Sequence, residues 1–288
     1  GQSGLLVISM KKLVSVGGER ILIKALLLDI DNTLLNAAGE LSPASKKAIN
    51  RAQASGIQVI LATARGYRST QTIHRELQLT TPAVCHMGAM VYDYTIQKPI
   101  IAWPLCTNIA HELAQLASDQ GIVISAYVGH EVWFNRMPDI PLRKDWVVQT
   151  DLVAALQGKS TLEMVVVDEK PIEAIIVAIK QMNWAKQVAL GRLEEAGRNW
   201  LFITRAGISK ASALDWLLPQ LGLTWQDTAA CGDGTADLEM IQRAQWGLAA
   251  PLAHPLVKEA AHAPFQVDQS EPIASLVQEI LNRRGSKI

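Results

Sequence analysis

"ALLLDIDNTLL" (residues 25–35) decides the fold, because it joins a strongly apolar run to two aspartates that stand one residue apart. The wider run "ILIKALLL" (residues 21–28) is apolar almost throughout and too short for a typical helix, which favours a buried strand. In parallel α/β sheets, ligands bind beyond the carboxyl ends of the strands, where Asp29 and Asp31 lie. Residues i and i+2 of an extended chain face the same way. Both carboxylates can therefore point into one crevice, where a cation or a shared proton must offset their repulsion.

Strands and helices alternate after this segment. The stretch "SPASKKAINRAQASG" (residues 42–56) predicts a helix, since Ser42 suits its N-cap and Pro43 its first turn. "IQVILAT" (residues 57–63) predicts a second buried strand, and "AVCHMGAMVYD" (residues 83–93) a third strand region after another helix. This order is typical of a parallel sheet with helices on both faces.

The chain between residues 92 and 202 has a different pattern. Strand-like segments in pairs, such as "IVISAYVGHEVWFN" (residues 122–135), are mixed with helical ones, which predicts an α+β domain with a largely antiparallel sheet. The first pattern returns after residue 202. We therefore predict an α/β core formed by residues 20–91 and 203–288, with residues 92–202 inserted as a second, α+β domain. Residues 1–19 are predicted to be a tag or an otherwise extraneous segment.

Composition limits the classes of function. The 27 basic and 27 acidic residues cancel, so the basic footprint that nucleic-acid binding requires is missing. No apolar run reaches the ~20 residues of a membrane-spanning helix, so we expect no membrane partner. Cys85, Cys106 and Cys231 lie far apart in no metal-type spacing, which favours reduced thiols and a cytoplasmic location. Both a monomer and a homodimer stay open.

Further polar residues are expected at the ends of the other strands. Thr63 follows the second strand with a hydroxyl and backbone amides that suit an anion. Lys210 starts a predicted helix in "GISKASAL", and Asp233 and Asp237 stand in the glycine-flanked loop of "GDGTADLEM". If the sheet forms as predicted, four carboxylates, a lysine and a hydroxyl meet at one edge. That set suits a magnesium ion and a phosphoryl group.

Four segments, "DIDNTLL", "LATAR", "GISKASAL" and "GDGTADLEM", resemble in this order the four motifs of the haloacid dehalogenase (HAD) superfamily. They look most like the motifs of the Cof-type phosphatases, which carry a large α+β (C2-type) cap between the second and third motifs. The resemblance covers nearly the whole chain from residue 21 onward. It implies a HAD-like, Rossmann-like core with the inserted domain as its cap. It also implies a magnesium-dependent phosphatase that acts on a small phosphorylated metabolite, such as a sugar phosphate, through an aspartyl-phosphate.

The resemblance implies a role for each matching residue. Asp29 is the expected nucleophile, and Asp31 is the expected general acid and base. Thr63 and Lys210 are expected to hold the phosphoryl group. The expected metal ligands are Asp29, Asp31 (through its backbone carbonyl), Asp233 and, directly or through water, Asp237. The expected substrate contacts are Thr63, Ala64, Arg65, His86, Met87, Lys210 and Ala236.

Four positions depart from the family pattern. Asn32 and Ala64 stand where glycine is usual, and Met87 and Ala236 stand where asparagine is usual. Related branches tolerate Asn32, whereas the other three predict an altered or narrow substrate preference, or a modest rate. Candidate contacts to the leaving group are Arg65, His86, His130, Trp133, Arg136 and Arg143.

Three alternative functions are weighed against the phosphatase. The main one is a binding or regulatory protein that kept the fold and lost turnover; Met87 and Ala236 support it, whereas the retention of Asp29 and Asp31 opposes it. A phosphotransferase or phosphomutase of the same superfamily usually carries a smaller, helical cap. A receiver domain also uses an acidic pair, a threonine and a lysine, but it is much shorter and has no large insertion.

Overall fold

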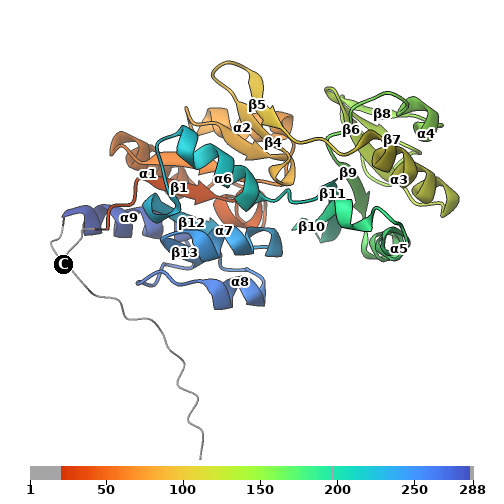
Figure 1. The fold of residues 1–288 in the computed structure, drawn as a ribbon. Coiled ribbons are helices and arrows are strands. Elements are labelled where there is room, and N and C mark those ends of the chain that lie inside the picture. The colour runs from red at the N-terminus through yellow and green to blue at the C-terminus, as the bar shows by residue number, and fades with distance from the viewer. Residues whose placement is uncertain (1–20, 196, 286–288) are drawn as a thin grey trace, which may run out of the picture.

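The structure is a computed structural model, and it describes residues 21–195 and 197–285. The segment 1–19, predicted to be extraneous, lies outside the described residues. The described chain forms two parts that lie next to each other, an α/β core at the left of Figure 1 and a second part at the right that consists of residues from the middle of the chain. The predicted fold class, a parallel α/β core with an inserted α+β cap, is confirmed.

Four parallel strands form the core sheet in the order β13-β12-β1-β2. β1 (Ala25–Leu28) lies in the middle of this sheet, and all four of its residues are buried. Its neighbours are β12 (Thr228–Gly232) and β2 (Gln58–Leu61), and β13 (Trp246–Ala249) borders β12. A parallel strand that is covered on both faces is expected to be apolar throughout, as β1 is.

Alternate residues of β1 pack against two different layers of helices. Leu26 and Leu28 belong to a core cluster with α1 (Pro43–Ala54), α2 (Tyr67–Glu76) and α9 (Pro272–Gly285). Ala25 and Leu27 belong to a cluster with α6 (Lys210–Gln220), α7 (Leu238–Arg243) and α8 (Pro255–Ala260). The side-chain period of two thus places helices on both faces of the sheet and leaves the strand ends exposed to a crevice.

The third strand region, predicted over residues 83–93, consists of two strands. β3 (Ala83–Cys85) and β4 (Met90–Asp93) are antiparallel and enclose a tight turn. His86 and Met87 in that turn have φ angles of 52° and 57°, so the chain reverses there. This conformation is uncommon for residues other than glycine, asparagine and aspartate, which is why the sequence pattern did not predict the turn.

β5 (Lys98–Ala102) pairs with β4 and completes a three-stranded sheet. A parallel bridge between Ala62 and Val84 attaches β3 to the edge of the core sheet. The hairpin β4–β5 therefore belongs with the core by its pairing, and this favours a domain boundary after Ala102. The predicted division at residue 92 stays a prediction.

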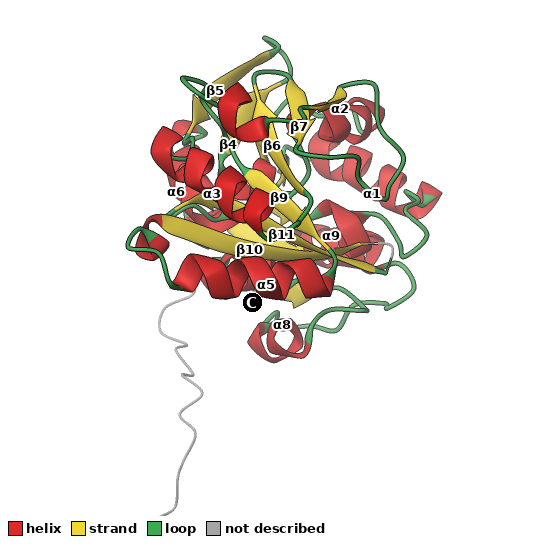
Figure 2. Ribbon diagram, turned by 90° about the vertical axis from the view of Figure 1, so that its right-hand side faces the viewer, coloured by secondary structure: helices red, strands yellow, loops and turns green. Residues whose placement is uncertain are grey.

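A six-stranded sheet forms the cap in the order β10-β11-β9-β6-β7-β8, and its neighbouring strands are antiparallel except for β7 and β8. The strands are β6 (Ile124–Val128), β7 (Glu131–Phe134), β8 (Trp146–Val148), β9 (Met164–Val167), β10 (Val188–Glu195) and β11 (Arg198–Arg205). The helices α3 (Thr107–Asp119), α4 (Leu152–Ala155) and α5 (Glu169–Lys180) pack on one face of this sheet. Figure 2 shows α5 running along β10 and β11. The sequence did not predict β8 and α4, which are too short to show a period.

Helices of the described residues are all too short or too polar to cross a membrane.

Candidate active site

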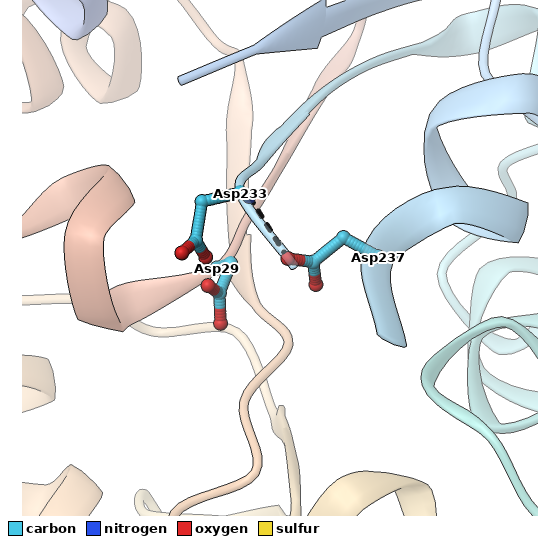
Figure 3. Close-up of side chains that lie close together, drawn as sticks. All are labelled: Asp29, Asp233 and Asp237. Carbon is cyan, nitrogen blue, oxygen red and sulfur yellow. Dashed lines mark hydrogen bonds between the residues drawn. The ribbon is translucent and has the colours of Figure 1, made fainter. Parts of the chain in front are cut away.

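Four side chains from the two halves of the core meet beyond the carboxyl end of β1. Asp29 directly follows β1, and one oxygen from each of Asp29, Asp233 and Asp237 lies within 4.8 Å of the others. Figure 3 shows the three carboxylates gathered at the ends of β1 and β12. The Nζ of Lys210 lies 2.7 Å from Oδ1 of Asp29 and 2.7 Å from Oδ1 of Asp237. All of these residues were predicted to be site residues from the motifs.

Asp237 is held by its own loop. The backbone N–H groups of Asp233 and Gly234 donate to its Oδ2 over 3.0 and 3.1 Å, while Lys210 donates to its Oδ1. Both oxygens of Asp237 are therefore engaged. This geometry favours the water-mediated or supporting role among the two predicted for Asp237, and half-buried Asp233 is the most exposed of the three carboxylates.

The electrostatics of this cluster favour an additional cation. Burial raises the pKa of Asp29 well above its ordinary value, the charge of Asp237 raises it further, and Lys210 acts in the opposite direction. Burial likewise raises the pKa of Asp233. Three carboxylates face one ammonium group, so a hard divalent cation with oxygen ligands fits the donor set. The carboxylate of Asp31 is not part of this group, which is consistent with a role for its backbone carbonyl.

Lys210 is placed by the helix that it starts and by a glycine of the core. Ser209 caps α6, since its side chain accepts from the N–H of Ser212 over 3.0 Å. Gly88, with a φ of 101°, packs so closely against this cap that a Cβ atom there would lie 2.1 Å from the carbonyl oxygen of Ser209. Burial lowers the pKa of Lys210, but the charges of Asp237 and Asp29 outweigh burial, so its pKa is raised. The lysine is thus kept as a cation.

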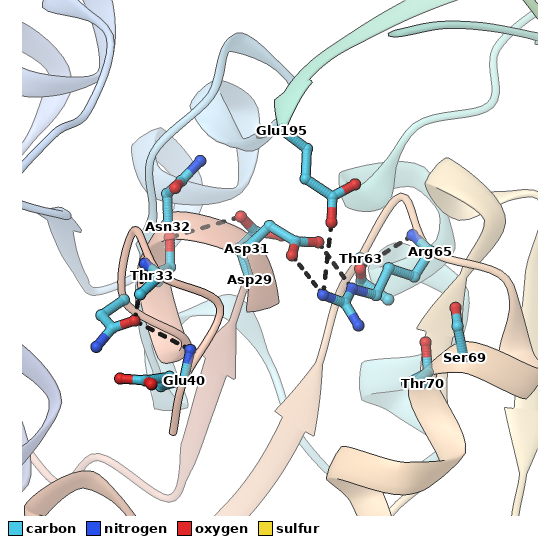
Figure 4. Close-up of polar contacts among 12 residues, drawn as sticks. Asp29, Asp31, Asn32, Thr33, Glu40, Thr63, Arg65, Ser69, Thr70 and Glu195 are labelled. Atoms are coloured by element: carbon cyan, nitrogen blue, oxygen red, sulfur yellow. Dashed lines mark hydrogen bonds and ion pairs between the residues drawn. The ribbon is translucent and has the colours of Figure 1, made fainter. Parts of the chain in front are cut away.

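Thr63 lies at the end of β2 beside Asp31 and Arg65 (Figure 4). Its Oγ1 accepts from the backbone N–H of Arg65 over 3.0 Å, and its carbonyl accepts from the N–H of Met87 over 3.1 Å. The hydroxyl proton of Thr63 can therefore donate to an anion. Thr33 donates to Oδ2 of Asp29 over 3.5 Å, so it supports the expected nucleophile through a side chain.

Asp31 forms a two-point ion pair with Arg65. The Nε and Nη2 of Arg65 donate to Oδ2 and Oδ1 of Asp31 over 2.9 and 2.6 Å. A second acid, Glu195 of β10, has its Oε1 3.7 Å from the same Nη2 (Figure 4). Glu195 was not predicted as a site residue, because a glutamate outside the recognised motifs resembles any surface residue.

Asn32 has a φ of 55°, which explains its departure from the family pattern. Glycine enters the left-handed region without a steric cost, and asparagine is among the few other residues that do so readily. The side-chain amide of Asn32 donates to the carbonyl of Glu194 in the cap over 3.3 Å. The substitution therefore keeps the turn and adds a contact to the cap.

The three other departures lie in one apolar cluster between core and cap. Ala64, Met87 and Phe202 are its buried members, and Val165, Leu193, Trp200 and Ala236 pack against them. A Cβ atom on Gly191 of β10 would lie 2.9 Å from Cγ of Met87, so the cap strand rests on the methionine side chain. Alanine and methionine at these positions thus replace polar or minimal groups with a surface that the cap covers.

A cavity of about 710 Å³ lies between the core and the free face of the cap sheet. Strand register explains its cap wall: Tyr127 pairs with Glu163, and Ser125 with Val165, so all four point to the face opposite α3 and α5. The core contributes Ala64, Arg65, Gly66, Arg68, Ser69 and His86. The volume suits a small metabolite.

His86 joins the two parts inside this cavity. Its Nε2 accepts from the backbone N–H of Tyr67 over 3.2 Å, so Nδ1 carries the proton and donates to Oε1 of Glu163 over 2.7 Å. Both residues are buried. With its ring nitrogens occupied, His86 contributes to the packing of cap on core, and its predicted contact with substrate stays a prediction.

The candidate leaving-group contacts separate into two sets. His130 and Arg143 line the cavity together with Arg65 and His86. Trp133 instead packs against the helix-covered face of the cap sheet, and Arg136 bonds to the carbonyl of Gly121 over 3.4 Å. Glu163 and Trp200 were not predicted as cavity residues. The alternation of side chains along β9 and β11 is the signal that could have assigned them to the free face of the cap sheet.

Comparison of the chain with known proteins identifies one family. A family model for haloacid dehalogenase-like hydrolases matches residues 26–277. Pyridoxal phosphate phosphatase YbhA of Escherichia coli is 26% identical over 274 residues, which is 88% of this chain and 97% of that protein. The 5-amino-6-(5-phospho-D-ribitylamino)uracil phosphatase YcsE of Bacillus subtilis is 23% identical over 278 residues, with 92% and 98% of the two chains covered.

The fold is also found in solved structures. A haloacid dehalogenase-like hydrolase from Bacteroides thetaiotaomicron superposes with a TM-score of 0.74 at 22% identity, covering 90% of this chain and 99% of that one. The four sequence motifs, the parallel sheet that places them together and the family match agree. The chain belongs to the haloacid dehalogenase-like hydrolase family.

Proposed function

We propose that this phosphatase is magnesium-dependent and removes phosphate from a small phosphorylated metabolite through an aspartyl-phosphate on Asp29. The observation that carries the proposal is the position of Lys210, 2.7 Å from both Asp29 and Asp237, next to Asp233. The lysine and a cation beside it neutralise two anions, the carboxylate and the phosphoryl group, that otherwise repel each other. The names of the relatives YbhA and YcsE support a phosphorylated small molecule as substrate.

Each step is assigned to residues of the chain. A carboxylate oxygen of Asp29 forms a bond to phosphorus as the bond from phosphorus to the leaving oxygen breaks, and Asp31 gives its proton to that oxygen. Asp31 then takes a proton from a water molecule, whose oxygen attacks phosphorus and releases Asp29. Thr63 donates to the phosphoryl oxygens, and Lys210 holds Asp29 in place. Magnesium, when bound by Asp29, Asp233 and the carbonyl of Asp31, supplies positive charge to the phosphoryl oxygens.

The cap provides the leaving-group site. The cavity of about 710 Å³ admits a small molecule, and its wall combines aromatic side chains such as Trp200 with cations such as Arg143. Covering the site with the cap excludes water other than the attacking molecule. A cytoplasmic location and a monomeric or homodimeric state of the protein stay predictions.

Phosphate release over a panel of phosphorylated metabolites, with and without magnesium, tests the proposal. We expect release from at least one compound, dependence on magnesium, and loss of at least ~10³-fold in kcat for Asp29→Asn. Turnover that persists in Asp29→Asn removes this residue from its role.

A second candidate is a binding protein with weakened turnover. The two-point pair of Arg65 with Asp31 favours it, because both oxygens of the expected acid are occupied. Tight binding of metabolites without any phosphate release is the outcome that selects this candidate.

A further inference from the structure

The last part of strand β10 lies across the loop that holds Asp31. Gly191 rests on Met87, and the carbonyl of Glu194 accepts from Asn32 over 3.3 Å. Glu195, the last residue of the strand, is directed into the cavity next to Arg65 (Figure 4). The contacts of Glu194 and Glu195 therefore bring the end of this cap strand next to the expected acid.

Arg65 binds both carboxylate oxygens of Asp31 in this structure. Its Nε and Nη2 donate to Oδ2 and Oδ1 of Asp31 over 2.9 and 2.6 Å. Two parallel charge-assisted hydrogen bonds form one of the stronger polar contacts in proteins. Both oxygens of Asp31 are therefore turned toward Arg65, and this orientation has to change before the carboxyl group can present a proton to a leaving group.

Glu195 is a second acceptor for the same guanidinium. Its Oε1 lies 3.7 Å from the Nη2 that donates to Asp31, beyond hydrogen-bond distance but within that of an ion pair. A small rotation of the Arg65 side chain therefore exchanges one carboxylate for the other without moving the backbone. The core supplies Arg65 and Asp31, whereas the cap supplies Glu195, so the exchange depends on the position of the cap.

We propose that Glu195 is a positioning residue that draws Arg65 away from Asp31 when a substrate fills the cavity beneath the cap. The inference rests on the proposed phosphatase function, in which Asp31 is the acid. Once Arg65 is paired with Glu195, an oxygen of Asp31 is free to carry the proton and to give it to the ester oxygen as the bond to phosphorus breaks. In this way the acid becomes available only while the leaving group is covered.

Leaving-group dependence tests the proposal. The variants are Glu195→Gln and Glu195→Ala, with Glu194→Gln as the matched control, because the Glu194 side chain points away from the cavity into solvent. The substrates are an alkyl phosphate, whose leaving oxygen needs a proton, and p-nitrophenyl phosphate, whose leaving group departs without one. We expect kcat on the alkyl ester to fall by about tenfold or more, toward the roughly 10²–10⁴ that general acid catalysis contributes, with a change below about threefold on the aryl ester.

A merely structural role gives a different result. Equal losses on both substrates, or no loss on the alkyl ester, overturn the proposal while the phosphatase function stands. A second readout is a crystal structure of the wild type with magnesium and orthovanadate, in which we expect Arg65 to bond to Glu195. Retention of the two-point pair with Asp31 in that complex overturns the proposal. A wild type that neither hydrolyses either ester nor binds orthovanadate overturns the proposed function, and this inference with it.

Discussion

The Nζ of Lys210 lies 2.7 Å from Oδ1 of Asp29, although 181 positions separate the two residues in the chain. The same atom lies 2.7 Å from Oδ1 of Asp237, and all three side chains are buried. A buried ammonium between two carboxylates supports the charge balance of the whole site, so its removal affects both stability and activity.

Lys210→Met is expected to lower the free energy of unfolding by about 3–5 kcal/mol at neutral pH without metal, because buried carboxylates lose their counter-charge. Urea denaturation measures the change. Lowering the pH should recover part of the loss, since the raised pKa of Asp29 allows the acid to take up a proton. Lys258→Met, at an exposed lysine of α8, serves as the control, and equal losses in the two variants contradict the assignment.

Magnesium is expected to raise the melting temperature more at pH 7.5 than at pH 5. The pKa values of Asp29 and Asp233 are raised in the folded state, mainly by burial. The folded state therefore keeps protons that the unfolded chain releases above about pH 4. Without metal, the free energy of unfolding falls as the pH rises from about 4 through the raised pKa values of the folded state. A bound cation stabilises the folded state by about 2.7 kcal/mol at 100 times its dissociation constant, and that constant is smaller at pH 7.5, where the cation does not have to displace protons.

Differential scanning fluorimetry over pH and magnesium concentration measures this effect. Asp233→Asn should reduce the magnesium-dependent shift while leaving the metal-free protein at least as stable as the wild type. A shift of the same size in Asp233→Asn places the metal elsewhere.

Gly88→Ala is expected to cost about 2–4 kcal/mol and to reduce kcat. A Cβ atom there meets the backbone carbonyl of Ser209 at 2.1 Å, and the φ of 101° disfavours any side chain. Since Ser209 precedes Lys210, relief of the clash moves the lysine. Gly56→Ala is the control, because its φ is 76° but nothing lies within 4 Å of the new Cβ, so only about 1 kcal/mol of backbone strain is expected. Similar kinetics for both variants contradict the predicted coupling.

Met87→Asn is expected to change substrate preference. Asparagine suits the φ of 57° better than methionine does, but it removes a buried side chain from the apolar cluster with Phe202. We expect a net loss of about 1–3 kcal/mol and a rise in the ratio of kcat/KM for polyhydroxylated over aromatic leaving groups. Met137→Asn, at an exposed methionine, is the control. An unchanged ratio shows that the cluster affects cap packing alone.

Much of the fold follows from local patterns. The buried strand β1, the helix cap at Ser42 and the alternation of strands and helices are all visible in short windows of sequence. The turn at His86 and Met87 was not predicted, because its backbone conformation depends on packing against α6 and the cap. The short elements β8 and α4 were missed because three or four residues do not establish a period.

The candidate site likewise combines residues that sequence motifs predict with residues that only the structure identifies. Asp29, Asp31, Thr63, Lys210, Asp233 and Asp237 could be named from motifs, and the structure brings Lys210 and three of the aspartates into contact. Their catalytic roles stay predictions. The cap residues Glu163 and Glu195 could not be named, because their importance comes from partners on the other domain.

By itself, the sequence determined a parallel core sheet with an acidic tip, since hydrophobic period and residue spacing are local properties that short segments carry. Only the tertiary structure decided that Arg65 holds Asp31, that Glu195 lies within reach of that pair, and that Ala64, Met87 and Ala236 share one apolar cluster. Those contacts depend on strand register and on how the cap lies over the core, and both are set by packing between residues far apart in the chain.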